Sequence, residues 1–321
     1  MDLLLSIDNL NVYFYRSEGV LKAVDGISYN LHKGEVLGIV GESGSGKSVS
    51  VLSIVRLLPA NGKIVDGSIS FDGKDILKLS MNELQDIRGK DIGFVFQDPM
   101  SSLNPVITVG QQVMEPLLWH NLCSREEAYK RAKNMLGMVG IPFPEERMKE
   151  YPFQFSGGMR QRVMIAIALI CNPKLLIADE PTTSLDVTTQ AQIIRLLKNM
   201  RSELDMSVIL ITHNLALTSN FCDRLIIMYA SNMMETGGTK DVLNTPSHPY
   251  TRFLLDAVPD IEVEKELVPI PGTIPDLINP PEGCKFHPRC PMSMDICRTE
   301  KPPLFPVGDG HYSACWLCGR E

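Results

Sequence analysis

The sequence has no apolar run long enough to cross a membrane. Its longest strongly apolar run, Val163 to Cys171, has charged residues on both sides, whereas a spanning helix needs about 20 apolar residues. The N-terminal stretch Met1 to Leu5 also lacks the basic start and long apolar segment of a secretory signal. We therefore expect the chain to stay in the cytosol and, in any membrane process, to dock on other subunits.

The sequence also lacks the excess of positive charge that binding to a phosphate polymer requires. Its formal net charge is −7, with 44% hydrophobic and 21% charged residues, which is the composition of a globular protein. We find no internal repeat and no coiled-coil heptad. At 321 residues the chain is long for one domain and short for two independent cores, so we expect a main domain with an appendage.

Short apolar runs rich in valine and isoleucine alternate with helical patterns along the chain. Runs that are apolar on both faces are typical of buried strands in a mostly parallel sheet, so we predict an α/β core. Between Pro99 and Leu169 the strand pattern stops, and helical patterns at Glu126 to Val139 and Arg160 to Leu169 predict a helical insertion over residues 98–170. The predicted strands are Val36 to Val40, Ile92 to Phe96, Leu175 to Ala178, Val208 to Ile211 and Leu225 to Met228.

The C-terminal part, from Pro246 onward, is rich in proline and cysteine. It holds 13 of the 22 prolines, and five of the eight cysteines fall within the last 38 residues. Such a segment is mostly turns and extended chain and buries little core unaided. We therefore expect it to need an external staple, that is, a cross-link that holds it together. In a reducing compartment, clustered cysteines favour a metal over disulfides. Spacing alone leaves an iron–sulfur cluster and a structural zinc as equal alternatives, since only Cys315 and Cys318 form a Cys-x-x-Cys pair.

A glycine-rich segment directly after the predicted strand Val36 to Val40 matches the P-loop pattern. Its glycines let backbone N–H groups turn inward around phosphates, and the following helix points its positive end at them. We expect Lys47 to reach the β- and γ-phosphates of a nucleotide and Ser48 to ligate Mg²⁺. The residues expected at the phosphates are Gly41, Ser43, Gly44, Ser45, Gly46, Lys47 and Ser48.

A second apolar strand, Leu175 to Ala178, ends in two carboxylates, Asp179 and Glu180. We expect Asp179 to hold Mg²⁺ through water and Glu180 to polarise the water that attacks the γ-phosphate. A strand that ends in an acidic turn is common in proteins. In the same chain as a P-loop, however, this pair predicts ATP hydrolysis.

The segment from Phe155 to Arg162, between these two motifs, resembles the signature sequence of ABC-type transport ATPases. Phe155 and Met159 stand where the family usually has leucine and glutamine. The resemblance implies that three residues, before a helix that begins near Arg160, bind the γ-phosphate of the ATP held by a partner subunit. By themselves they would more often be a simple helix cap. They are Ser156, Gly157 and Gly158.

Further elements of the same family follow in the expected order. Gln97 matches the glutamine that senses Mg²⁺ and the attacking water, and His213 matches a histidine that contacts the γ-phosphate. Asp186 belongs to Ser184-Leu185-Asp186, which matches the loop that crosses the dimer interface. Alone, a histidine or a glutamine would mean little, but the joint set in one order identifies the chain as a member of this family.

The adenine-stacking residue of the family matches Phe14, in the segment Leu10 to Tyr15. Tyr13 and Tyr15 are neighbouring aromatic alternatives, and a half-buried strand explains the segment equally well.

Three C-terminal segments resemble the extension of the dipeptide and oligopeptide importer ATPases. They are His248 to Arg252, Pro269 to Pro275 and Gly283 to Pro291. The resemblance implies a [4Fe–4S] cluster with a structural role, and Zn²⁺ is the alternative. Its ligands would be Cys284, Cys290, Cys297 and Cys315, with Cys318 as a spare.

The resemblance implies a P-loop NTPase fold: a RecA-like, mostly parallel sheet, an antiparallel N-terminal β subdomain and the helical insertion. Residues 1–245 would form the ATPase domain and residues 246–321 the extension. It also implies an ATP-hydrolysing subunit at the cytoplasmic face of the membrane, which powers import of dipeptides or oligopeptides by ATP-driven dimer closure. Its partners would be two permease subunits, a second ATPase (identical or paralogous) and, indirectly, a solute-binding protein.

Three other functions fit parts of the pattern. The same motor in a nickel or other small-solute importer is the nearest, because such systems share this architecture. An ABC ATPase acting on nucleic acid is disfavoured, since long coiled-coil arms, fused cassettes and a basic surface are missing from the sequence. A binding module with an inactive ATP site is rejected, because the residues needed for hydrolysis are present. These are Lys47, Asp179, Glu180 and His213.

Overall fold

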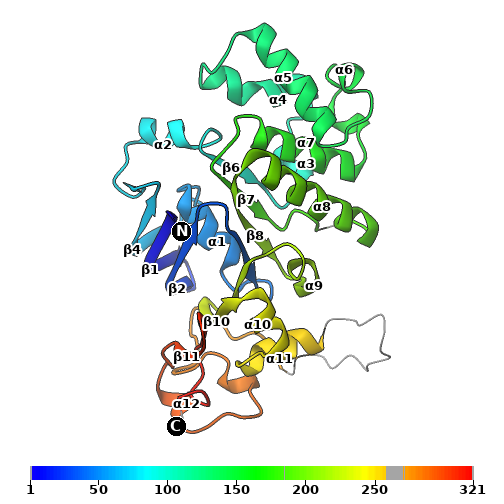
Figure 1. The fold of residues 1–321 in the computed structure, drawn as a ribbon. Helices are drawn as coiled ribbons and strands as arrows, with labels where there is room; N and C mark the ends of the chain where they lie inside the picture. The colour runs from blue at the N-terminus through cyan, green and yellow to red at the C-terminus, as the bar shows by residue number, and fades with distance from the viewer. Residues whose placement is uncertain (1, 184, 258–269, 271, 320–321) are drawn as a thin grey trace. The chain divides into compact units, whose positions relative to one another are not determined.

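The computed structural model describes residues 2–183, 185–257, 270 and 272–319 (Figure 1). The chain forms two compact units. The first comprises Met1–His32, Val36–Leu77 and Ile211–Glu321, and the second comprises Lys33–Glu35 and Lys78–Leu210. Among the described residues, none of the helices is both long and apolar enough to span a membrane.

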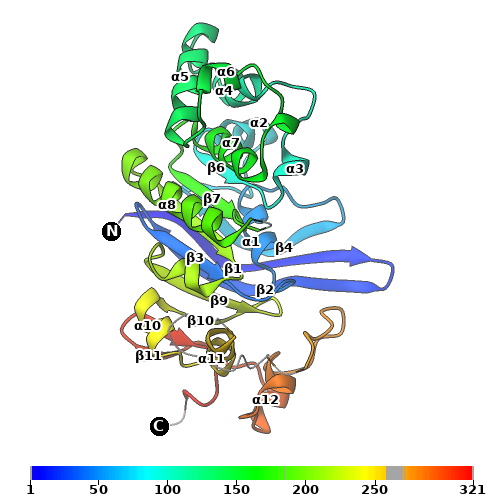
Figure 2. The ribbon, with the colours of Figure 1, turned by 90° about the vertical axis from the view of Figure 1, so that its right-hand side faces the viewer.

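The first unit contains a four-stranded antiparallel sheet in the order β2-β1-β4-β5. The long strands β1 (Leu3–Arg16) and β2 (Gly19–His32) run side by side as a hairpin (Figure 2). Strands β4 (Gly62–Phe71) and β5 (Lys74–Asp75) complete the sheet. Apolar side chains of β1, such as Leu10, are fully buried and form its core. The predicted antiparallel β subdomain is confirmed.

A second set of strands in the first unit has the order β11-β12-β10-β9-β3. Strand β3 runs parallel to β9, and all of its residues are buried, as expected of an apolar run in a parallel sheet. Strands β9, β10, β12 and β11 then pair antiparallel to one another in that order. The strands are β3 (Val36–Val40), β9 (Arg224–Tyr229), β10 (Asn232–Gly238), β11 (Phe305–Gly308) and β12 (His311–Ser313). The helices of this unit are α1 (Lys47–Ile54), α9 (Leu215–Thr218), α10 (Thr239–Asn244), α11 (Pro249–Asp256) and α12 (Ile296–Thr299).

The proline-rich extension is attached to this sheet by a buried carboxylate, Glu235 of β10. Its two oxygens accept hydrogen bonds from the backbone N–H groups of Ser247 (2.7 Å) and His248 (3.0 Å). One of them also lies 2.7 Å from Nε2 of His311, on the added strand β12. A carboxylate with no exposed surface needs such partners, so Glu235 fixes the path of the extension.

Aromatic side chains add to this attachment. Tyr229 of β9 packs against Tyr250 of α11, with ring centroids 4.7 Å apart, and against Phe286, at 5.2 Å. All three are buried. The expectation that the extension needs an external staple is therefore only partly right. Its prolines prevent long regular elements, but its aromatic residues and edge strands join the core of the first unit.

The second unit has strands in the order β8-β7-β6, with β6 parallel to β7. They are β6 (Ile92–Val95), β7 (Leu175–Asp179) and the part of β8 (Ser207–Thr212) up to Leu210. Residues 98–170, all of which are described, contain helices and no strand, so the predicted helical insertion is confirmed. The helices of the unit are α2 (Met81–Ile87), α3 (Pro99–Ser102), α4 (Val109–Trp119), α5 (Arg125–Met138), α6 (Pro144–Arg147), α7 (Gly157–Leu169) and α8 (Val187–Leu204).

Candidate nucleotide site and cysteine pocket

The P-loop connects β3 to α1 in the first unit and has the tight backbone that the sequence predicts. Gly46 precedes α1 with φ of 98°, and a Cβ there would lie 2.3 Å from the carbonyl oxygen of Ala23. A Cβ on Gly41 would lie 2.0 Å from the carbonyl oxygen of Met228. Because real Cβ atoms do not approach backbone so closely, both positions require glycine.

The side chain of Lys47 is hydrogen-bonded to the backbone of this loop. Its Nζ donates hydrogen bonds to the carbonyl oxygens of Gly41 (2.8 Å) and Glu42 (2.9 Å), although the side chain is buried. The hydroxyl of Ser45 is also buried and has no hydrogen-bond partner among the described residues. A buried ammonium and an unsatisfied hydroxyl in one loop fit a site built around an anion.

The two predicted carboxylates stand at the end of β7 in the second unit. Asp179 is 5% exposed. Glu180 has φ of 45°, in the left-handed region that non-glycine residues rarely adopt. Its Oε2 accepts hydrogen bonds from Nε2 of Gln97 (3.0 Å) and Oγ1 of Thr183 (2.8 Å). The structure thus brings together the predicted pair Gln97 and Glu180, and it adds Thr183, which no motif indicated.

The signature segment begins helix α7 in the same unit. Ser156 is the N-cap residue, and its Oγ accepts a hydrogen bond of 3.3 Å from the N–H of Met159. The helix begins at Gly157, so the expected start near Arg160 was wrong, because the Ser156 cap allows the helix to include both glycines. Ser156 and Gly157 are exposed and Gly158 is half-buried.

Asp186 caps helix α8 of the second unit. Its carboxylate accepts hydrogen bonds from Oγ1 (2.7 Å) and N–H (2.9 Å) of Thr189, and these bonds lower the pKa of Asp186 below its ordinary value. The aspartate therefore has a structural role as a cap besides any role at an interface. Ser184, which belongs to the same predicted loop, lies outside the described residues.

The two remaining predicted nucleotide residues belong to the first unit. His213 is exposed and follows β8 directly. Phe14 is half-buried in β1, and its ring packs on Gly62 of β4, where a Cβ would lie 2.8 Å from the ring. Tyr15 is 48% exposed, with Nζ of Lys63 5.6 Å from its ring centroid. The choice of Phe14 as the adenine-stacking residue stays a prediction.

Four cysteines of the extension line one small pocket, together with apolar and aromatic side chains such as Phe286 and Trp316. Burial raises the pKa of Cys284 to about 11 and that of Cys315 to about 12, and the neighbouring thiols add to both increases. The four are Cys284, Cys290, Cys297 and Cys315. Cys318 is not among the residues that line this pocket, and its Sγ lies 4.0 Å from the carbonyl oxygen of Ser247.

The described part of the chain contains no group of three or more histidine, cysteine, aspartate or glutamate side chains arranged to hold a metal ion. The expected cluster, and zinc as its alternative, therefore stay predictions.

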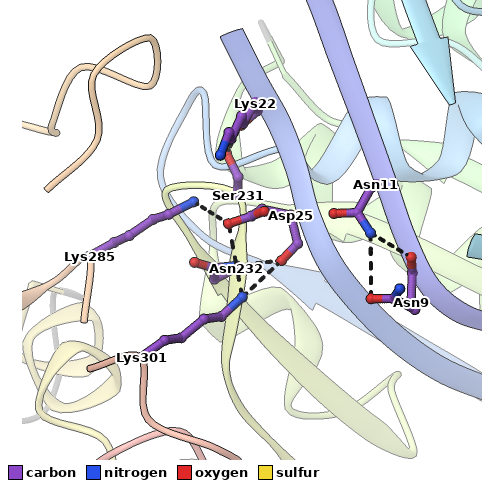
Figure 3. Close-up of polar contacts among 8 residues, drawn as sticks. All are labelled: Asn9, Asn11, Lys22, Asp25, Ser231, Asn232, Lys285 and Lys301. Atoms are coloured by element: carbon purple, nitrogen blue, oxygen red, sulfur yellow. Dashed lines mark hydrogen bonds and ion pairs between the residues drawn. The ribbon is translucent and has the colours of Figure 1, made fainter. Parts of the chain in front are cut away.

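The residue beside Cys284 anchors the extension to β2 (Figure 3). Lys285, whose side chain is 6% exposed, donates a hydrogen bond of 3.0 Å from Nζ to Oδ2 of Asp25. Nζ of Lys301 donates to the backbone oxygen of Asp25 at 3.1 Å. Burial alone would raise the pKa of Asp25, but the ammonium groups of Lys285, Lys301 and Lys22 together outweigh it and lower the pKa. No motif indicated these contacts.

Comparisons with known proteins identify the family of the chain. The ABC transporter family model matches residues 24–183, and the family model for the C-terminal region of oligopeptide/dipeptide transporters matches residues 234–297. The dipeptide transport ATP-binding protein DppD of Bacillus subtilis is 51% identical over 99% of this chain and 95% of its own length. The oligopeptide transport ATP-binding protein OppD of the same organism is 50% identical over 98% and 88%.

A solved dimeric ATP-binding cassette with bound ADP and Pi is 32% identical to this chain, with a TM-score of 0.66. The likeness covers 73% of this chain and 98% of that one. The chain therefore belongs to the ABC transporter family, in the branch of the dipeptide and oligopeptide transport ATP-binding proteins. It is an ABC-type ATPase, and the predicted P-loop NTPase fold is confirmed.

Proposed function

We propose that this chain is the ATP-hydrolysing subunit of a membrane importer of dipeptides or oligopeptides. The observation that carries the proposal is the 51% identity to a dipeptide transport ATP-binding protein over almost the whole of both chains. That identity includes the extension, whose family model bears the name of oligopeptide and dipeptide transporters. The chain would act at the cytoplasmic face of the membrane, on two permease subunits, with a second ATPase and indirectly with a solute-binding protein.

In this mechanism each group of predicted site residues has its own task. Backbone N–H groups of the P-loop and Lys47 bind the phosphates, while Ser48 and Asp179 hold Mg²⁺. Asp186 and the signature residues Ser156 to Gly158 serve the ATP of the partner ATPase. Each ATP is then completed by a second chain, so that binding closes the dimer and hydrolysis lets it open.

Hydrolysis requires a group that positions and polarises the attacking water. Glu180 is proposed for this role, and its hydrogen bond to Gln97 supports it, because the amide holds the carboxylate in one orientation. His213 would contact the γ-phosphate. The protein contributes mainly position and charge stabilisation, since phosphoryl transfer needs no covalent help from side chains.

We further propose that the four pocket cysteines hold a [4Fe–4S] cluster, which would cross-link segments of the extension. Their common pocket supports this assignment. Protein purified without oxygen should contain iron and sulfide in near-equal amounts. Zinc as the sole bound metal would overturn the assignment.

The import function is tested with the full complex in liposomes. The chain, its two permeases, its partner ATPase and the binding protein are reconstituted, and ATP hydrolysis is measured with dipeptide, oligopeptide or Ni²⁺ outside. We expect stimulation by peptides together with peptide uptake. Stimulation by Ni²⁺ alone would assign the motor to a nickel importer, and a salt-sensitive complex with DNA or RNA would point to a nucleic-acid ATPase.

A further inference from the structure

Glu42, the second residue of the P-loop, is bound by an arginine of the C-terminal extension. Nη1 of Arg289 donates to Oε2 of Glu42 at 2.8 Å, and Nη2 donates to Oε1 at 3.3 Å. The arginine side chain is only 4% exposed and the glutamate side chain 24%. Such a bidentate ion pair fixes both the position and the orientation of the carboxylate.

Two tyrosines complete the contact. The hydroxyl of Tyr250 accepts a hydrogen bond of 3.0 Å from the backbone N–H of Glu42. The hydroxyl of Tyr229 accepts one of 3.3 Å from Nη1 of Arg289, whose guanidinium carbon also lies 5.5 Å from the ring centroid of Tyr229. We refer to Arg289, Tyr250 and Tyr229 as the Glu42 clamp.

The clamped residue also determines the internal shape of the P-loop. The carbonyl oxygen of Glu42 accepts hydrogen bonds from Nζ of Lys47 (2.9 Å) and from the N–H of Ser45 (3.2 Å). A displacement of Glu42 would therefore displace the contacts of the phosphate-binding lysine. In addition, a carboxylate without its arginine would place negative charge in a loop that must bind phosphates.

We propose that Arg289 is a positioning residue for nucleotide binding: by holding and neutralising Glu42, the C-terminal extension presets the P-loop for ATP. Arg289 touches the loop through a side chain and contacts no ligand-binding backbone group itself. The proposal rests on ATP binding at the P-loop. It gives the extension a role in the ATPase reaction and not only in the stability of the subunit.

The test is the dissociation constant for Mg·ATP and the steady-state KM and kcat of the full chain. We expect Arg289→Met to weaken ATP binding about tenfold and raise KM equally, with kcat at saturating ATP within about twofold of the parent. Arg289→Lys keeps the positive charge but loses the bidentate geometry. Its ATP affinity and KM should therefore lie between those of the parent and those of Arg289→Met. Glu42→Gln in the Arg289→Met protein should restore part of the lost affinity, because it removes the unpaired charge.

Two controls distinguish a failure of this proposal from a failure of the P-loop assignment. Arg147→Met removes an arginine of the second unit that pairs with Glu150 at 2.6 Å, and it should leave ATP affinity unchanged. Lys47→Ala should abolish binding, and if it does not, the P-loop assignment itself is wrong. Unchanged ATP affinity in a folded Arg289→Met protein would overturn the proposal, as would strictly additive effects of Glu42→Gln and Arg289→Met. If Arg289→Met does not fold, the same comparison of KM and kcat is made with Arg289→Lys and with Glu42→Gln.

Discussion

The P-loop and the signature segment are both glycine-rich and both lead into a helix, but they are built differently. The P-loop is buried at Gly41, Ser45 and Lys47, and its helix begins after a left-handed Gly46 without a side-chain cap. The signature segment is exposed at Ser156 and Gly157, and Ser156 caps its helix.

This difference indicates which contacts fix the conformation of each loop. Backbone of β2, a carbonyl of β9 and the Glu42 clamp all lie against the P-loop, so its shape is fixed by its own chain. The signature segment presents free helix N–H groups to its surroundings, which suits a partner that arrives from outside. Four predictions test this distinction, from the largest expected effect to the smallest.

The largest effect is expected for Glu180→Gln. Loss of the carboxylate removes the group that is proposed to polarise water, so kcat should fall about 10³-fold, while ATP binding at the P-loop is retained. Without hydrolysis, ATP should hold two chains together. Gel filtration with Mg·ATP should show a dimer of the variant and a monomer of the parent. Fast hydrolysis by the variant would assign the catalytic role to another residue.

A variant in the signature segment should separate binding from hydrolysis. Gly157→Glu adds a bulky negative group where the γ-phosphate of a second chain is proposed to dock, so hydrolysis should fall about 100-fold. ATP affinity of the isolated chain should not change. If affinity fell together with kcat, the signature segment would belong to the same binding step as the P-loop, and the distinction drawn above would fail.

The two glycine-rich loops should also differ in their tolerance of alanine. Gly46→Ala meets a carbonyl oxygen at 2.3 Å with φ of 98°, so the free energy of unfolding should fall by about 3 kcal/mol. At Gly157 the nearest atom to a new Cβ is 3.8 Å away. Gly157→Ala should therefore change stability by about 0.5 kcal/mol or less. Urea unfolding of both proteins checks this.

A smaller loss of stability than that of Gly46→Ala is expected where the extension meets β2. Asp25→Asn removes the partner of the buried Lys285 and should lower the free energy of unfolding by about 2 kcal/mol, without a change in ATP affinity. Because the pKa of Asp25 is lowered in the folded chain, its contribution is present above pH 4 or so and is lost as pH falls through the folded pKa. Trp316 fluorescence in a Trp119→Phe background would follow the first unit alone. Equal loss of stability at pH 3 and pH 7 would contradict this role for Asp25.

Most of the fold followed from local patterns. The five predicted strands are present to within one residue at either end, because uninterrupted runs of valine, isoleucine and leucine are stable only when both faces are buried. The start of α7 was misjudged, because glycines have low helix propensity while the Ser156 cap compensates for it. The edge strands β11 and β12 were not predicted, since short strands among prolines have no periodic signal.

The sequence by itself determined the nucleotide chemistry of this protein. The predicted phosphate-binding residues from Gly41 to Ser48, and the predicted pair Asp179 and Glu180, could be found from local order alone, because phosphate-binding loops and strand-end carboxylates are formed by consecutive residues. Only the tertiary structure decided how the P-loop is held. Arg289 lies 247 positions from Glu42, and no local pattern links them, because ion pairs between distant segments depend on how the core packs.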